Sequence, residues 1–178
     1  FSSVDIIDEG GEKLITPGGN FYRGHDMEGD DTGQYGISLR FRPEGLDVDF
    51  GLYYLNYHQK NQYWVYLDPT TANPAQNRLG NYYLVYPEDI QVIGASFSTQ
   101  IGLVNVSGEM SARFDAPLLS ETQVAVAGAD NDSNNLYALG DTFHANLSGI
   151  AFLQPTFLWE GGTLMGEIAY EDLMSKED

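Results

Sequence analysis

The sequence contains no cysteine and few cations, and these two shortages exclude several classes of protein. Without cysteine the chain can form no disulfide framework, thiolate metal site or thiol nucleophile. The 178 residues include 8 Lys and Arg against 26 Asp and Glu, which gives a formal net charge of −18. Binding to phosphates needs clustered cations, so we expect no nucleic-acid partner.

Long apolar runs are also missing, and the sequence has a different hydrophobic pattern in their place. No run of about 18 apolar residues occurs, so no membrane-spanning helix is predicted. In "VNVSGEMSARF" (residues 104–114), however, Val104, Val106 and Met110 alternate with polar residues such as Ser107 and Glu109. A period of two predicts a β-strand with one apolar and one polar face. Hydropathy windows average over such strands and do not detect those that cross a membrane.

The same alternation recurs along the chain and predicts three antiparallel β-hairpins within residues 34–173. Their connections are short, as in "PEGLD" and at Gly102–Leu103. The predicted hairpins cover residues 34–57, 88–114 and 143–170.

The segments between and before the hairpins are long or polar, and we interpret them as loops. They are an acidic, Gly-rich region at 1–33, two long loops at 58–87 and 116–142, and a polar tail or loop at 174–178. Tight turns that alternate with long loops are typical of an antiparallel transmembrane β-barrel, with short periplasmic turns and long extracellular loops. A soluble β-sandwich can also mix loop lengths and stays as an alternative.

Aromatic residues gather near the predicted strand ends, where barrels place them at the membrane interface. The candidate interface residues are Tyr53, Tyr54, Tyr57 and Trp64 on the long-loop side and Trp159 on the tight-turn side. In the sandwich alternative, these tyrosines would instead form a carbohydrate-binding groove.

The polar faces of the predicted strands carry side chains of both charge signs, as the lining of a water-filled lumen would. The candidate lumen-lining residues are Arg40, Arg42, Asp49, Glu109, Arg113, His144, Asn146 and Glu167.

Catalytic and metal-binding signals are weak. The sequence has no nucleophile elbow, zinc-protease helix or phosphate loop, and its three histidines are far apart, so we expect no catalytic residues and no enzyme. In "DNDSNNLYALGD", Asp130, Asp132, Asn134 and Asp141 occupy positions 1, 3, 5 and 12 of a calcium loop. Position 6 is Asn135 rather than Gly, and an acidic flexible loop is the alternative.

Six phrases together resemble a known family. They are "GQYGISLRF", "FGLYYLNYH", "YPEDIQVIGASF", "VSGEMSARFDAPL", "FHANLS" and "GEIAYEDL". In this order they look like the proteobacterial family called domain of unknown function 1302, over roughly residues 33–173. The resemblance implies a location in the bacterial outer membrane and a role in envelope transport. It also implies periplasmic or inner-membrane transport partners and hydrophobic or lipid-like solutes.

Six strands are too few to close a barrel, for which about eight are needed. Members of the family are also longer than this chain, so we expect a segment of a larger barrel. The predicted function is a porin-like channel or docking site that contacts outer-membrane lipid. The alternatives are a soluble secreted sandwich that binds carbohydrate and a structural or assembly subunit that pairs its strands with other chains.

Overall fold

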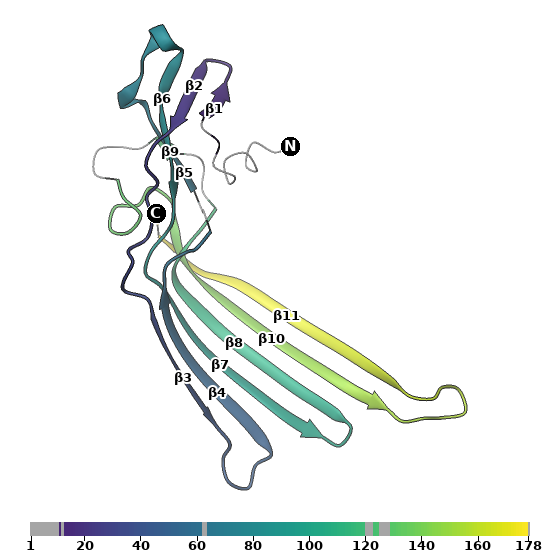
Figure 1. Cartoon of the computed structure of the whole chain (residues 1–178). Helices are drawn as coiled ribbons and strands as arrows, with labels where there is room; N and C mark the ends of the chain where they lie inside the picture. The colour runs from purple at the N-terminus through teal and green to yellow at the C-terminus, as the bar shows by residue number, and fades with distance from the viewer. Residues whose placement is uncertain (1–10, 12, 62–63, 120–122, 125–128, 178) are drawn as a thin grey trace.

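The computed structural model describes residues 11, 13–61, 64–119, 123–124 and 129–177, which form two β-sheets placed end to end (Figure 1). The all-β prediction is confirmed, because the described residues contain only strands, two short 3-10 turns and connections. Neither sheet closes on itself. A barrel is therefore not formed by the described residues alone.

The larger sheet, here called the meander, contains six antiparallel strands that lie side by side in chain order (Figure 1). The strands are β3 (Tyr35–Phe41), β4 (Val48–Tyr57), β7 (Ile90–Ile101), β8 (Val104–Pro117), β10 (Leu139–Leu153) and β11 (Gly162–Glu177). The three predicted hairpins are confirmed as β3–β4, β7–β8 and β10–β11. Strands β3 and β11 form the two open edges.

The three hairpin turns lie at the same end of the meander (Figure 1). The turn between β7 and β8 has only two residues, since Ile101 pairs with Val104. Gly102 there has φ 60°, a backbone conformation that glycine adopts without steric cost. The long connections leave the meander at the opposite end, beside the second sheet.

The second sheet, here called the small sheet, has five strands drawn from three distant parts of the chain. They are β1 (Lys13–Thr16), β2 (Gly19–Arg23), β5 (Trp64–Asp68), β6 (Arg78–Val85) and β9 (Gln123–Val124), in the order β1-β2-β6-β5-β9. Strands β1–β2 and β5–β6 pair antiparallel, whereas β2–β6 and β5–β9 pair parallel. Two 3-10 turns, η1 (Pro69–Thr71) and η2 (Pro74–Gln76), connect β5 to β6.

These strands correct the prediction that the connecting segments are loops. Residues 13–23 form a hairpin within the predicted N-terminal loop, and the loops at 58–87 and 116–142 contribute β5, β6 and β9. The parallel pairings join segments far apart in the sequence, which local alternation does not reveal. The predicted tail at 174–178 instead extends β11 as far as Glu177, because this part pairs with the start of β10. Residues 1–10, 12 and 178 lie outside the described part.

The hydrophobic core lies almost entirely in the small sheet and its connections. Tyr82 and Leu84 form one buried cluster, and Tyr66, Val85 and Tyr137 form another. The buried hydroxyls have partners: Tyr66 Oη accepts from Leu136 N at 2.7 Å, and Tyr137 Oη donates to Asn131 O at 2.8 Å. Burial raises the pKa of both tyrosines, so they stay neutral in the core.

A buried polar group joins the N-terminal segment to the meander. His58 is 4% exposed and lies just after β4. Its Nε2 is 2.7 Å from Thr32 O, and its Nδ1 accepts from Asp89 N at 3.1 Å. These partners require the neutral ring with the proton on Nε2. Asn56 adds bonds to Gly33 O and to Asp89 Oδ1, so residues 32–33, β4 and the start of β7 are tied together.

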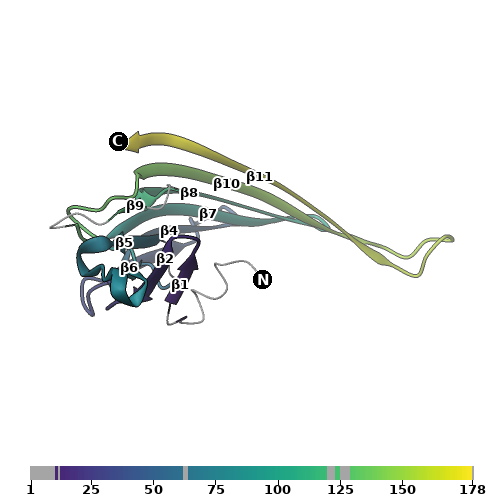
Figure 2. The same ribbon diagram turned by 90° about the horizontal axis from the view of Figure 1, so that it is seen from above.

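The meander, in contrast, buries neither of its faces along most of its length. The face defined here as apolar carries large hydrophobic side chains that remain 44–72% exposed: Ile37, Leu39, Phe41, Leu52, Ile93, Met110, Leu147, Leu164, Ile168 and Tyr170. The small sheet does not cover this face, because the sheets meet end to end (Figures 1 and 2). Among the described residues, no helix is long and apolar enough to cross a membrane.

Candidate functional site

The strand register gathers polar side chains on the face opposite the apolar one, called here the polar face. Directly paired residues of an antiparallel sheet share a face. One such row runs from Arg40 through Gly51 and Ser96 to Glu109 and Asn146. The adjacent row contains Asp49, Ser98, Ser107, Ser148 and Glu167.

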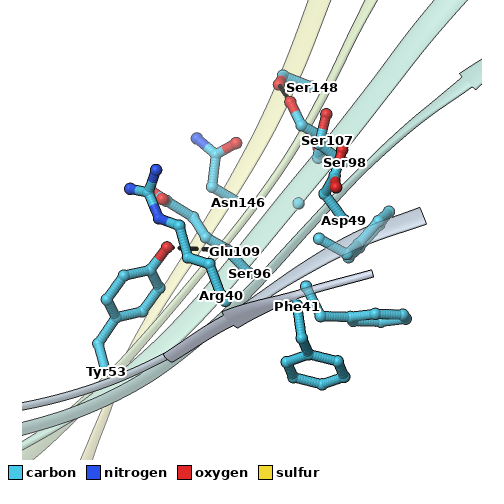
Figure 3. Close-up of a pocket in the computed structure, with 14 residues that line it drawn as sticks. Arg40, Phe41, Asp49, Tyr53, Ser96, Ser98, Ser107, Glu109, Asn146 and Ser148 are labelled. Carbon is cyan, nitrogen blue, oxygen red and sulfur yellow. Dashed lines mark hydrogen bonds between the residues drawn. The ribbon is translucent and has the colours of Figure 1, made fainter. Parts of the chain in front are cut away.

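These two rows surround a hollow of about 610 Å³, which we call the Arg40–Glu109 hollow (Figure 3). It is open on one side rather than enclosed. Its polar lining consists of Arg40, Asp49, Tyr53, Ser96, Ser98, Ser107, Glu109, Asn146 and Ser148. Figure 3 shows Phe41 pointing to the other side of the strands, as the alternation requires.

Hydrogen bonds across the strands fix several of the lining groups. Tyr53 Oη and Ser96 Oγ are 3.1 Å apart, and Ser107 Oγ and Ser148 Oγ are 2.9 Å apart. The guanidinium of Arg40 lies beside the Tyr53 hydroxyl at one wall (Figure 3). The floor of the hollow is therefore made of hydroxyl groups that can both donate and accept hydrogen bonds.

Arg42 and Asp49 form an ion pair at the tight-turn side of this hollow. Arg42 Nε donates to Asp49 Oδ1 at 2.9 Å, and the second guanidinium nitrogen donates to Oδ2. This two-point geometry holds both groups in place, although the pair is exposed and contributes little to stability.

A second hollow of about 490 Å³ lies further along the polar face toward the small sheet, beside Arg113, His144 and Glu171. His144 Nε2 is 3.0 Å from Thr142 Oγ1, and Nδ1 is 3.8 Å from Glu171 Oε1. The order hydroxyl, imidazole and carboxylate resembles a nucleophile relay, but 3.8 Å is beyond hydrogen-bond reach.

The predicted lumen-lining residues can now be placed. The strand register puts Arg40, Asp49, Glu109, Arg113, His144, Asn146 and Glu167 on the polar face, and Arg42 joins them through Asp49. The sequence reading missed the hydroxyl groups of Ser96, Ser98, Ser107 and Ser148. Alternation places these serines on the same face, but the predicted lining residues were charged, amide or imidazole side chains.

The predicted interface aromatics do not form one group. Tyr53 lies on the polar face, because it shares its alternation with Asp49 and Gly51. Trp64 begins β5 and, partly buried, packs against a core cluster of the small sheet, so it lies outside the meander. Tyr54 does lie on the apolar face, opposite Ile93, and Tyr57 pairs with Ile90 where β4 ends.

Trp159 lies in the turn between β10 and β11, at the far end of the meander from Tyr54 and Tyr57. It is 44% exposed, and its Nε1 donates to Gln154 O at 3.0 Å. Phe157 and Leu158 beside it are more exposed still. This turn therefore presents a cluster of apolar side chains at the far end of the sheet.

The predicted calcium loop is not assembled. Asp130 accepts from the backbone N–H groups of Asp132 and Asn134 at 3.1 and 2.7 Å, and from Ser133 Oγ at 3.2 Å. Burial would raise the pKa of Asp130, but these bonds lower it. Asp141 belongs to β10, where it accepts from Ser175. The described residues hold no group of three His, Cys, Asp or Glu side chains that could bind a metal.

Comparison with known proteins gives a family but no relative of known activity. No curated protein and no solved structure matches the chain significantly. The family model described as "Protein of unknown function (DUF1302)" matches residues 1–178, the whole chain. The resemblance seen in the sequence is thus confirmed, and the chain belongs to the DUF1302 family.

Proposed function

We propose that the meander is part of the wall of an outer-membrane β-barrel, with its apolar face toward lipid and its polar face toward a water-filled passage. The observation that carries the proposal is the exposure of the apolar face, where Ile168 is 72% and Ile37 is 71% exposed. Contiguous apolar surface of this extent marks an interaction with a membrane or another protein. A lipid environment would remove this surface from water.

The lengths of the strands support the same proposal. Strands β7, β8, β10 and β11 contain 12, 14, 15 and 16 residues. Strands of soluble proteins are mostly about five or six residues long, whereas a tilted strand needs about 9–11 residues to cross a bilayer. These four strands have enough residues to cross the bilayer and to continue beyond it on the side where the small sheet would lie.

The open edges β3 and β11 add a requirement. Unpaired backbone groups are costly in hydrocarbon, so a sheet in a membrane must be closed. We therefore propose that further strands pair with both edges and complete the barrel. The small sheet, whose core clusters are built mainly from its own strands and connections, would stand outside the bilayer.

In this arrangement the protein acts as a channel or docking site in envelope transport. The polar face supplies hydroxyl, amide and charged groups along the passage, and the two hollows supply places where a solute can pause. Periplasmic or inner-membrane transport partners, which the family resemblance implies, belong to the same proposal.

The direct test is whether the protein extracted from cells needs a membrane-like environment to stay folded. The extract is divided between detergent or lipid nanodiscs and detergent-free buffer, and strand content is followed by circular dichroism. We expect a folded, monodisperse species only with detergent or lipid. A monodisperse, folded species in detergent-free buffer would contradict the proposal and favour a protein that covers its apolar face itself.

A further inference from the structure

We propose that the Arg40–Glu109 hollow binds a small zwitterionic solute, such as a short peptide with free termini. The carboxylate of the solute would face Arg40, and its ammonium group would face Glu109. The inference rests on the proposed function, because the passage along the polar face is what brings a solute to the hollow. It goes further by naming the chemical class that the hollow selects.

Two opposite charges, Arg40 and Glu109, lie at the hollow. Arg40 on β3 and Glu109 on β8 lie in one row across the sheet, separated by the positions of Gly51 and Ser96. Three strand spacings place their backbones about 14 Å apart, so both long side chains reach over the space between. Figure 3 shows both side chains on the same side of the strands.

Neither charge is neutralised by an ion pair with the residues that the structure describes. The neighbouring charges differ: Arg42 pairs with Asp49, and Glu167 accepts from Asn146. Arg40 has the Tyr53 hydroxyl beside it, which is a neutral partner. Both charges lie near this hydroxyl at the hollow, and both are available to a solute of matching charges.

The hollow beside these charges has room for a small solute. Its volume of about 610 Å³ falls in the range of small-molecule sites. Gly51 contributes by accommodating the Tyr53–Ser96 hydroxyl pair, since a Cβ atom there would lie 2.3 Å from Tyr53 Oη and 2.6 Å from Ser96 Oγ.

The floor of the hollow consists of groups that form hydrogen bonds. Ser98, Ser107, Ser148 and Asn146 offer donors and acceptors that suit the amide groups of a peptide. A lipid-like solute, which the family resemblance implies, would cover these groups without bonding to them, and unpaired polar groups oppose binding. The lining thus favours a hydrophilic solute with separated charges.

The experiment uses the protein as extracted in detergent and measures binding of two matched probes by isothermal titration at low ionic strength. The probes are diglycine, which is zwitterionic, and N-acetyl-diglycine amide, which has the same backbone but no charge. We expect diglycine to bind at least tenfold more tightly than the blocked probe. Arg40→Gln or Glu109→Gln should each remove this preference.

A charge exchange sharpens the test. The double variant Arg40→Glu with Glu109→Arg should recover the preference, because the solute can bind in the reverse direction. Lys13→Gln and Glu160→Gln, which change the charge of exposed residues far from the hollow, should leave it unchanged. Equal binding of both probes, no binding of either to the folded protein, or equal effects of the distant variants would overturn the inference.

The outcome is separable from that of the proposed function. Diglycine preference in a protein that proves soluble without detergent would retain the site and reject the membrane role. Detergent dependence without diglycine preference would retain the membrane role and reject the site.

Discussion

Both sheets of this protein carry many apolar and aromatic side chains, yet the small sheet buries them and the meander leaves them exposed. The small sheet buries Tyr66, Tyr82 and Leu84 almost completely. The meander leaves Met110, Leu147 and Ile168 about half exposed or more on a face that no other described element covers. Hydrophobic content alone therefore does not define a core, since a core also requires a second layer.

The difference follows from how each sheet is connected. The small sheet draws strands from three distant segments, and their side chains and connections converge on two core clusters. The meander is made of consecutive hairpins in a single layer. In the proposed membrane, lipid takes the place of the missing layer. Substitutions in the two sheets are therefore expected to have different effects.

The largest effect is expected in the core of the small sheet. Tyr66→Ala removes a fully buried ring together with its hydrogen bonds to Leu136 N and Asp130 O. We expect a loss of about 3–5 kcal/mol in the free energy of unfolding, measured by denaturant titration of the reconstituted protein. Leu119→Ala, at a side chain that is 90% exposed, is the control and should change it by less than about 0.5 kcal/mol.

The next effect distinguishes the faces of the meander. Leu147→Arg places a charge on the apolar face and should cost about 2–4 kcal/mol of folding free energy in lipid vesicles if the site lies at mid-depth. Val106→Arg should behave similarly. Ser107→Arg, on the polar face, is the matched control and should be tolerated. Equal tolerance of the substitutions on the two faces would refute the assignment of lipid to the apolar face.

A smaller effect is expected where the two regions join. His58→Ala leaves Thr32 O and Asp89 N without their buried partner, and we expect a total loss of about 1–3 kcal/mol. Hydrogen exchange should show faster opening of residues 32–33 and of the start of β7, while β10 and β11 are unaffected. His25→Ala, at an exposed histidine, should change nothing, and a similar response to both variants would argue against the junction.

The smallest effect concerns pH. The pKa of Asp130 is lower in the folded protein than its ordinary value of 3.8, so its carboxylate stabilises the fold above that pH. This contribution disappears as the pH falls through the lowered pKa. Asp130→Asn should therefore reduce stability at about pH 6 and by a smaller amount at about pH 3, as measured by denaturant midpoints.

Asp132→Asn is the control for this comparison, because the Asp132 carboxylate accepts no hydrogen bond from the residues that the structure describes. It should leave the pH dependence of stability as in the parent protein. A pH dependence that survives in Asp130→Asn would show that another group is responsible.

The sequence predicted the meander well and the small sheet poorly, and the reason is the range of the interactions. Alternation such as that of Val104, Val106 and Met110 is a local signal, and turns such as Gly102–Leu103 join the two strands of each hairpin. The parallel pairings of β2 with β6 and of β5 with β9 join segments that carry no sign of one another in the sequence.

The candidate site shows the same division. Alternation was sufficient to put Arg40, Glu109 and Asn146 on one face. It could not show that these residues line one hollow, because this depends on which strands are neighbours and on their register. The position of Trp64 in the small sheet was missed for a related reason, since its segment contributes to a core assembled from distant strands.

The central claim is that one face of the meander meets lipid and the other meets water, and spin labels can measure this directly. The chain has no cysteine, so single cysteine substitutions at positions 104 to 112 of β8 give unique labels in vesicles. We predict that accessibility alternates, with positions 106 and 110 open to oxygen dissolved in lipid and positions 107 and 109 open to a water-soluble nickel chelate. Equal accessibility of both faces to the nickel chelate would contradict the account.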